Sequence, residues 1–420
     1  MKVCVIGNGG REHALAWRLS ISPSVTKVYA IPGSAAMSDC AELVGIDWQQ
    51  SDHMISFLKD NQVDLVVIGP EAPLVAGLAD VLNKAGIPVF GPSKAAAQLE
   101  GSKVFAKDLM KKYNIPTAAY GVFHKVDEAK EFIAQTGAPI VVKADGLAAG
   151  KGVVVAMTLE EANVAVEDML RGNRFGEAGS TVVIEEFMEG EEASLLAFVD
   201  GKTVVPMIAS QDHKRIFDGD KGPNTGGMGT YAPAPVLTDA LRDEAMKTIL
   251  EPMVAAMEKE GMPYVGCLYA GLMITPQGPK VVEFNARFGD PETQVVLPLL
   301  DSDLGQIMMA CATGTLTADM VKWKDSSAAC VILASKGYPE TSSKGDVIHG
   351  DIKQHDTTIV FHSGTKLIGD EYVTNGGRVL GVVGLGKDLR TALDRAYGRI
   401  EHIDFEGMQY RTDIGAKAFK

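Results

Sequence analysis

Long hydrophobic runs are missing from this sequence of 420 residues. No apolar stretch approaches the roughly 18–20 residues that a membrane-spanning helix needs. The first residues, MKVCVIGNGG, turn into a glycine-rich loop after a short apolar run, which is not the pattern of a secretion signal. We therefore expect a soluble protein without a membrane partner.

Cysteine pairs are missing as well. The five cysteines are scattered along the chain and form no C-x-x-C motif. This spacing argues against a zinc site or a disulfide framework, and it favours a reducing compartment. The sequence therefore predicts a cytoplasmic protein.

Basic residues are fewer than acidic ones. The sequence has 40 Lys and Arg residues and 54 Asp and Glu residues, which gives a formal net charge of −14. Bulk repulsion at that charge disfavours general binding to nucleic acid or to anionic membranes. An anionic small-molecule substrate remains possible if its site supplies cations or a metal ion of its own.

What the sequence does contain is a regular alternation of short apolar strands and helical segments in residues 1–100. This rhythm predicts parallel βαβ units, whose ligands bind at the carboxyl ends of the strands. Here those ends carry the loops GNGGRE and GPEAPL. We expect helices near 51–60 and 75–85 in this part.

From residue 102 the pattern changes. We expect a helix over 102–113, two strands around the loop DGLAAGKG, a helix near 159–170 and a hairpin over 193–208. Residues 211–233 are expected to form a long loop, and TPQGP is a turn signal between strands 264–275 and 279–288. The last 90 residues or so return to strands and turns, with one helix around 388–401. The fold class is therefore multidomain α/β and α+β.

Two glycine-rich loops suggest phosphate binding without matching a standard motif. GNGGRE has Glu12 where a dinucleotide fingerprint needs its third glycine, and the following strand ends without an acid. An anion at the helix N-terminus and a simple tight turn both remain open. DGLAAGKG is one residue short of a P-loop and lacks its Ser or Thr. It is either a flexible flap that closes over phosphates, with Lys143 before it, or an ordinary hairpin.

GPNTGGMGTYAP, residues 222–233, is too rich in glycine to be expected as helix or strand. Its backbone N–H groups could form an anion nest around Thr225. A disordered linker is the alternative, which the preceding charged QDHKR segment disfavours. VVIEEF ends a strand in Glu185 and Glu186. These acids either cap the strand or mark a nucleotide site, where backbone groups contact adenine.

VVEFNARFGDPE, residues 281–292, places Glu283, Asn285 and Arg287 at every second position of a strand. Side chains at that spacing share one face. Carboxylate and amide oxygens suit Mg²⁺, which also takes phosphate oxygens and water. Arginine adds a planar fork for a phosphate or a carboxylate. The alternative is a solvated strand face with a Glu–Arg pair.

Together these motifs resemble those of the ATP-grasp ligases. The resemblance rests on SKVFAKDLM, VVKADGLAAGKGV, IEEFMEGEE, QDHKR, GPNTGGMGTYAP and VEFNARFGDPE. GNGGREHALAW, GPEAPL and the late NGGRVLGVVGLG resemble the phosphoribosylamine–glycine ligase family in particular. The motifs occur in the same order and cover essentially the whole chain.

The resemblance implies a reaction in which ATP, glycine and 5-phosphoribosylamine give glycinamide ribonucleotide, ADP and phosphate through glycyl phosphate. It implies ATP as co-substrate and Mg²⁺ or Mn²⁺ as cofactor. We expect a monomer. It also implies an N-terminal open parallel α/β domain at 1–101, an ATP-grasp domain at 102–325 with a lid at 121–189, and a small mixed α/β domain at 326–420. Two alternatives are another ATP-grasp carboxylate–amine ligase and a non-catalytic nucleotide-binding regulatory protein.

The resemblance also implies residue roles. Catalytic roles go to Lys143, Asp212, Asn224 and Arg287. ATP contacts go to Lys103, Lys143, Glu185, Glu186, Phe187, Met188, Glu192, Arg215 and Asn224. Substrate contacts go to Gly9, Gly10, Glu71, Asp212, Thr225, Gly226, Gly227 and Arg287. The metal ligands would be Glu283 and Asn285. His213 is a weaker candidate for moving protons.

Overall fold

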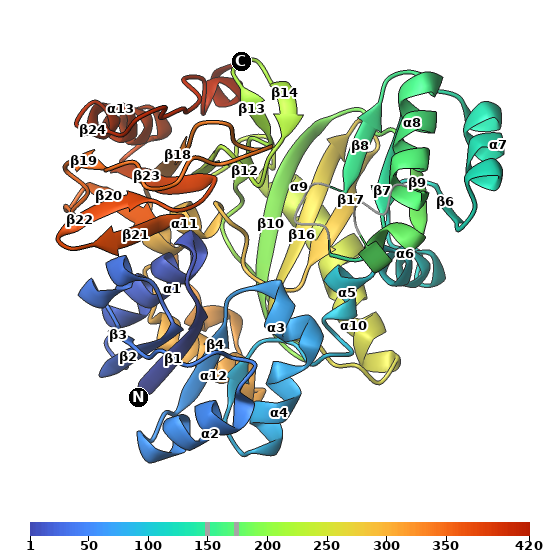
Figure 1. Ribbon diagram of the computed structural model, residues 1–420. Coiled ribbons are helices and arrows are strands. Elements are labelled where there is room, and N and C mark those ends of the chain that lie inside the picture. The colour runs from blue at the N-terminus through green and yellow to red at the C-terminus, as the bar shows by residue number, and fades with distance from the viewer. Residues whose placement is uncertain (148–151, 172–175) are drawn as a thin grey trace.

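The computed structural model describes residues 1–147, 152–171 and 176–420 (Figure 1). Four of its sheets have four or five strands each, and the remaining sheets are two-stranded. The middle of the predicted flap, residues 148–151, lies outside the described residues. Within the described ranges no helix is long and apolar enough to cross a membrane.

The N-terminal part is the predicted open parallel sheet, with strand order β3-β2-β1-β4-β5. Its strands are β1 (Lys2–Gly7), β2 (Lys27–Pro32), β3 (Glu42–Leu43), β4 (Leu65–Ile68) and β5 (Val89–Phe90). Its helices are α1 (Gly10–Ser20), α2 (Ser51–Asp60), α3 (Glu71–Ala76) and α4 (Leu78–Lys84). The single helix expected at 75–85 is therefore wrong, because Gly77 with φ of 95° separates two short helices.

The segment predicted as the lid forms a four-stranded antiparallel sheet of order β6-β9-β7-β8. Its strands are β6 (Tyr120–Phe123), β7 (Ile140–Ala144), β8 (Val153–Ala156) and β9 (Val182–Glu186). Helices α7 (Val126–Thr136) and α8 (Leu159–Leu170) share one apolar core with this sheet. Thr158 accepts a hydrogen bond from Glu161 N and so caps the start of α8.

The second sheet of the central part has the order β11-β10-β16-β17. Its strands are β10 (Glu191–Asp200), β11 (Val204–Pro206), β16 (Val265–Thr275) and β17 (Gly278–Asn285). The nearby helices are α5 (Gln98–Gly101), α6 (Lys103–Lys112), α9 (Asp239–Ala245) and α10 (Glu251–Lys259). β16 and β17 are joined by the predicted tight turn.

The C-terminal part contains a five-stranded sheet of order β12-β15-β18-β23-β20. Its strands are β12 (Gln211–Asp212), β15 (Gly229–Ala232), β18 (Ser327–Ala334), β20 (Thr358–His362) and β23 (Arg378–Gly386), and α13 (Leu389–Ile400) packs against it. Smaller elements complete this half of the chain: α11 (Thr293–Val296), α12 (Leu304–Thr313), β19 (His349–Gly350), β21 (Thr365–Ile368), β22 (Glu371–Thr374) and β24 (Ile403–Asp404).

The expectation of a long loop over 211–233 is wrong. This segment contains β12 and β15, and between them the two-stranded hairpin of β13 (Arg215–Phe217) and β14 (Lys221–Asn224). β15 is a strand because it pairs with β18, about a hundred residues later in the chain. That pairing outweighs the low strand propensity of its glycine-rich sequence.

Candidate active site

A cavity of about 780 Å³ lies between the lid sheet and the β10–β16–β17 sheet. Its walls also include residues from α3, α6, the β13–β14 hairpin and β23. Most sequence-predicted site residues line it: Glu71, Lys103, Lys143, Glu185, Glu186, Phe187, Met188, Glu192, Asp212, Arg215, Asn224, Thr225, Gly226, Glu283, Asn285 and Arg287. Gly9, Gly10 and Gly227 are not among its lining residues.

Strand β17 supplies oxygen donors from one face, as its alternation predicts. Phe284 and Ala286 are buried, whereas Glu283 and Asn285 alternate with them and reach the cavity. Burial acts to raise the pKa of Glu283, but Lys214, Lys143 and Lys103 outweigh it, so that this pKa lies below its ordinary value. Glu283 is therefore a carboxylate at neutral pH.

A buried carboxylate between two lysines forms the end of the cavity near β9. Glu185 Oε2 lies 3.0 Å from Lys143 Nζ and 3.2 Å from Lys107 Nζ. Lys143 Nζ also donates to the Val282 carbonyl at 3.1 Å. Burial lowers the pKa of Lys107 to about 8, against the opposing effect of Glu185. This pairing occupies the Glu185 side chain, and the Glu185 backbone is paired in the sheet with Tyr120 of β6 and Val141 of β7.

A second acid–base group lines the cavity at β12. Lys214 Nζ is 2.6 Å from Asp212 Oδ2. Glu292 is buried and accepts hydrogen bonds from Tyr269 Oη at 2.8 Å and Ser194 Oγ at 3.1 Å. Burial raises the pKa of Asp212 to about 6; Lys214 opposes that shift and Glu292 adds to it.

Arg287 pairs across the boundary between the N-terminal and central parts. Its Nη2 lies 2.8 Å from Glu100 Oε1 and its Nε 3.4 Å from Glu71 Oε2. Glu100 also accepts from Ala286 N at 2.7 Å, which fixes the end of β17. Burial acts to lower the pKa of Arg287, but Glu100 and Glu71 outweigh it and the pKa is raised. The two acids are thus ion-pair partners of Arg287, whose Nη1 also donates to the Phe288 carbonyl at 3.3 Å.

The geometry argues against the backbone anion site that the sequence suggested at the start of α1. At α1, Gly9 N donates to Glu12 Oε2 at 2.8 Å, so the carboxylate of Glu12 occupies the place of the anion that the sequence left open beside a simple tight turn. A Cβ on Gly10 would lie 2.3 Å from Ser363 Oγ, which shows that this residue faces packed protein. Substrate contacts of Gly9 and Gly10 therefore stay predictions without support from this geometry.

The anion nest expected around Thr225 is wrong for residues 225–228. The N–H groups of residues 225–228 all donate to protein acceptors. The acceptors are, in order, the Lys214 carbonyl at 2.7 Å, Tyr338 Oη at 3.0 Å, Thr225 Oγ1 at 3.0 Å and the His213 carbonyl at 2.8 Å. Thr225 and Gly226 still line the cavity, whereas Gly227 lies behind Asp212.

His213 does not line the cavity. It is buried, its Nδ1 lies 2.9 Å from the Gly229 carbonyl, and burial lowers its pKa to about 4. The geometry therefore gives it a structural place and offers no route for the proton transfer suggested from sequence.

Several cavity residues were not singled out from sequence: Arg11, Glu100, Lys107, Lys214, Glu292 and Arg378. All except Glu100 lie inside motifs that carried the family resemblance, so the motifs were informative but the residue choice was incomplete. Arg378 comes from β23 and donates to the carbonyls of Asp290 at 2.8 Å and Gly226 at 3.1 Å. The C-terminal part thus contributes a cation to the cavity wall.

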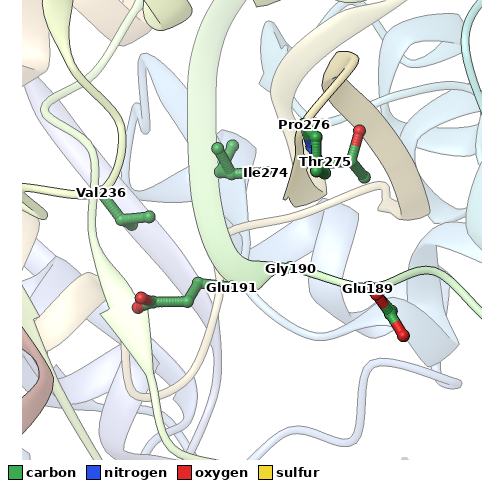
Figure 2. Close-up of a pocket in the computed structure, with 7 residues that line it drawn as sticks. All are labelled: Glu189, Gly190, Glu191, Val236, Ile274, Thr275 and Pro276. Carbon is green, nitrogen blue, oxygen red and sulfur yellow. The ribbon is translucent and has the colours of Figure 1, made fainter.

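A smaller depression of about 380 Å³ adjoins the segment that leads into β10. Figure 2 shows Glu189, Gly190 and Glu191 beside the β16–β17 turn at Thr275 and Pro276. A Cβ on Gly190 would lie 2.2 Å from the Ile274 carbonyl oxygen, so only glycine fits this close approach. The depression has no cation among its lining residues, and the three residues 189–191 also line the large cavity.

The oxygen donors at Glu283 and Asn285 fit a hard cation held jointly with phosphates. In the described part of the chain no group of three or more His, Cys, Asp or Glu side chains could hold a metal ion alone. Mg²⁺ usually binds through one or two carboxylates together with phosphate oxygens and water. This donor set therefore suits a cation that enters with a nucleotide.

Comparison with known proteins defines first the class and then the family. The phosphoribosylglycinamide synthetase models match in three parts: the N domain at residues 1–100, the ATP-grasp (A) domain at 101–293 and the C domain at 328–417. One similar solved structure is the biotin carboxylase domain of 2-oxoglutarate carboxylase from Hydrogenobacter thermophilus, in complex with MgADP and bicarbonate. Its TM-score is 0.75 at 16% identity, and the alignment covers 97% of this chain and 91% of the carboxylase chain. The fold is the ATP-grasp fold.

More similar relatives narrow the assignment. A phosphoribosylamine–glycine ligase of Neisseria meningitidis serogroup A is 53% identical over 421 residues, which is 100% of this chain and 99% of the relative. The crystal structure of a phosphoribosylamine–glycine ligase from Thermotoga maritima has a TM-score of 0.86 at 34% identity. The alignment covers 99% of this chain and 100% of the Thermotoga chain. The chain belongs to the phosphoribosylglycinamide synthetase family.

Proposed function

We propose that this protein ligates glycine to 5-phosphoribosylamine with ATP, giving glycinamide ribonucleotide, ADP and phosphate. The observation that carries the proposal is the convergence on one cavity of oxygen donors from β17 and lysines from α6 and β7. Full-length similarity to ligases of this name supports the choice of substrates.

The nucleotide would lie between the two central sheets. The segment from Glu185 to Met188 would form the adenine wall through backbone groups, and Glu192 would bind the ribose. Lys103 and Lys143 would neutralise phosphate oxygens, together with Arg215 and Asn224 on the β13–β14 hairpin. Glu283 and Asn285 would hold Mg²⁺ or Mn²⁺, which when bound neutralises charge on the phosphates. All of these residues line the cavity.

The chemistry follows from the poor electrophilicity of a carboxylate. A carboxylate oxygen of glycine attacks the γ-phosphorus, ADP leaves, and glycyl phosphate forms. The ribosylamine nitrogen then attacks the carbonyl carbon, phosphate leaves with the former carboxylate oxygen, and the nitrogen loses one proton to give the neutral amide. Such transfers depend on positioning and charge neutralisation rather than on a protein nucleophile.

Substrate positions are proposed at the end of the cavity near the N-terminal part. Glu71 and Asp212 would face the ribosylamine, and Arg287 a carboxylate or phosphate. Thr225 and Gly226 line the same cavity. Arg287 is already paired with Glu71 and Glu100, so a substrate anion would share its guanidinium rather than meet a free one.

The test is ADP release with 5-phosphoribosylamine generated in place from ribose 5-phosphate and ammonia, omitting each component in turn. We expect ADP only when glycine, the ribosylamine and a divalent cation are all present. ADP without the ribosylamine would favour another ATP-grasp carboxylate–amine ligase. ATP binding with no glycine-dependent ADP release would favour a regulatory nucleotide-binding protein. The cytoplasmic location, the monomeric state and the exclusion of nucleic-acid and membrane partners stay predictions from the sequence.

The raised pKa of Asp212 predicts a pH dependence. A carboxyl group with a pKa near 6 is charged above that pH and neutral below it. If the carboxylate binds the amine, kcat/KM for the ribosylamine should fall as the pH drops through about 6, by roughly tenfold per further pH unit. Asp212→Asn, assayed under the same conditions, should show a low and flat profile. Persistence of the same inflection in this variant would contradict the assignment.

A further inference from the structure

The β13–β14 hairpin carries two proposed phosphate contacts but belongs to no larger sheet. Arg215 and Asn224 are paired across it and both line the cavity. The hairpin's tip is exposed, with Phe217 55% accessible. An isolated two-stranded hairpin is marginally stable in water. Some other part of the protein must therefore fix the position of this hairpin.

The polar contacts that hold the hairpin come from residues 411–417, which we name the brace. The buried Ile216 of β13 also packs against Met228, Ala334 and Tyr338. Among the described residues, every side-chain hydrogen bond and ion pair that leaves 215–224 ends in this segment. Thr412 N donates to Asp218 Oδ1 at 2.8 Å, and Gly219 N donates to Asp413 Oδ2 at 2.9 Å. Lys417 Nζ lies 2.8 Å from Asp220 Oδ2. Figure 1 shows the C-terminal end of the chain beside β13 and β14.

Arg411 is the centre of the brace. Its side chain is 1% exposed. Its Nη1 donates to the backbone carbonyl of Arg215 at 3.1 Å and to Asp220 Oδ1 at 2.9 Å. Its Nε and Nη2 donate to the two carboxylate oxygens of Asp413 at 2.7 and 2.8 Å. A buried guanidinium with this many partners has one orientation, and it fixes the backbone of Arg215 directly.

The brace is itself attached to the C-terminal part. Tyr397 Oη, on α13, donates to the Arg411 carbonyl at 2.8 Å and accepts from Ile414 N at 3.1 Å. Ile414 packs against Gly229 at the start of β15. The brace therefore connects the C-terminal core to a hairpin on the wall of the nucleotide cavity.

We propose that Arg411 is a positioning residue for ATP, acting through the backbone of Arg215 and through Asp220 to hold the β13–β14 hairpin against the nucleotide phosphates. This inference rests on the proposed function, which places Arg215 and Asn224 at those phosphates. Arg411 is not among the residues that line the cavity, so it would act without touching a substrate itself. Its effect should therefore appear in ATP binding and leave glycine binding nearly unchanged.

The test compares Arg411→Ala with Arg399→Ala in the full-length protein. Arg399 is a matched control, since it is a largely buried arginine of the same part, paired with Asp351 at 2.6 Å and away from the hairpin. We expect Arg411→Ala to raise the Kd of MgATP in calorimetric titration, and KM for ATP, by roughly tenfold, with KM for glycine changed less than twofold. Arg399→Ala should leave all three near wild type. A lower melting temperature with unchanged ATP affinity would mean a merely structural role and would overturn the proposal.

Thr412→Val keeps the inference testable if Arg411→Ala does not fold. It removes one hydroxyl that hydrogen-bonds Asp218 near the surface, so folding should survive. We expect a rise in the Kd of MgATP of roughly threefold, and an unchanged value would count against the brace. Because these titrations need no turnover, they distinguish this inference from the proposed function. Wild-type protein that binds ATP but never releases ADP would rule out the proposed function and leave the inference about Arg411 open to the same titrations.

Discussion

Glu283→Gln should reduce turnover by roughly 10³-fold at saturating ATP and ordinary magnesium concentrations. The substitution keeps the shape of the side chain but removes the only carboxylate of the proposed metal set. Metal-ion catalysis contributes several kcal/mol of charge stabilisation, and each 1.36 kcal/mol is about tenfold in rate. Because Glu283 lies among Lys103, Lys143 and Lys214, its loss also leaves their positive charge less balanced.

The measurement is the steady-state rate of ADP release over a range of magnesium concentrations. Glu258→Gln is a suitable control, since Glu258 lies on α10 in an exposed pair with Lys202. We expect the control to match wild type throughout. A wild-type rate in Glu283→Gln at ordinary magnesium would rule out the metal assignment.

Gly227→Ala should impair both stability and catalysis. Gly227 has φ of 125°, a conformation that other residues adopt only with strain of about 1–3 kcal/mol. A Cβ there would lie 2.6 Å from Pro291 Cδ and 2.8 Å from both carboxylate oxygens of Asp212. We expect the free energy of unfolding to fall by at least that strain. Displacement of Asp212 should lower kcat/KM per folded molecule by roughly 10²-fold.

Gly261→Ala separates the two effects. Gly261 also has a positive φ, 76°, but a Cβ there would meet nothing within 4 Å. The control should lose some stability in denaturant titration and keep full kcat/KM. Equal activity of the two folded variants would show that Gly227 does not position Asp212.

The predictable part of the site is the part encoded by local pattern. Glu283 and Asn285 could be placed on one cavity face because a strand alternates its side chains and the buried Phe284 and Ala286 keep that period. The parallel N-terminal sheet could be predicted for a similar reason, since β1, β2 and β4 are short apolar runs, whereas the two-residue edge strand β3 has no such pattern.

The features that could not be predicted from the sequence depend on contacts between residues that are distant in the chain. Glu100 lies in no motif, and its importance appears only when Arg287, 187 positions later in the printed sequence, folds against it. β15 is a strand because β18 pairs with it. The sequence suggested free N–H groups in the glycine-rich segment before β15. In the folded protein these groups donate to acceptors from distant residues such as Tyr338.

The measurement that tests the account most directly follows the oxygen atoms of glycine. Glycine labelled with ¹⁸O in both carboxylate oxygens would be converted with ATP, magnesium and 5-phosphoribosylamine, and the released phosphate analysed by mass spectrometry. Activation as glycyl phosphate predicts one ¹⁸O atom in each phosphate and one in the amide carbonyl of the product. Phosphate without ¹⁸O, released in step with product, would contradict carboxylate phosphorylation and with it the mechanism proposed for this cavity.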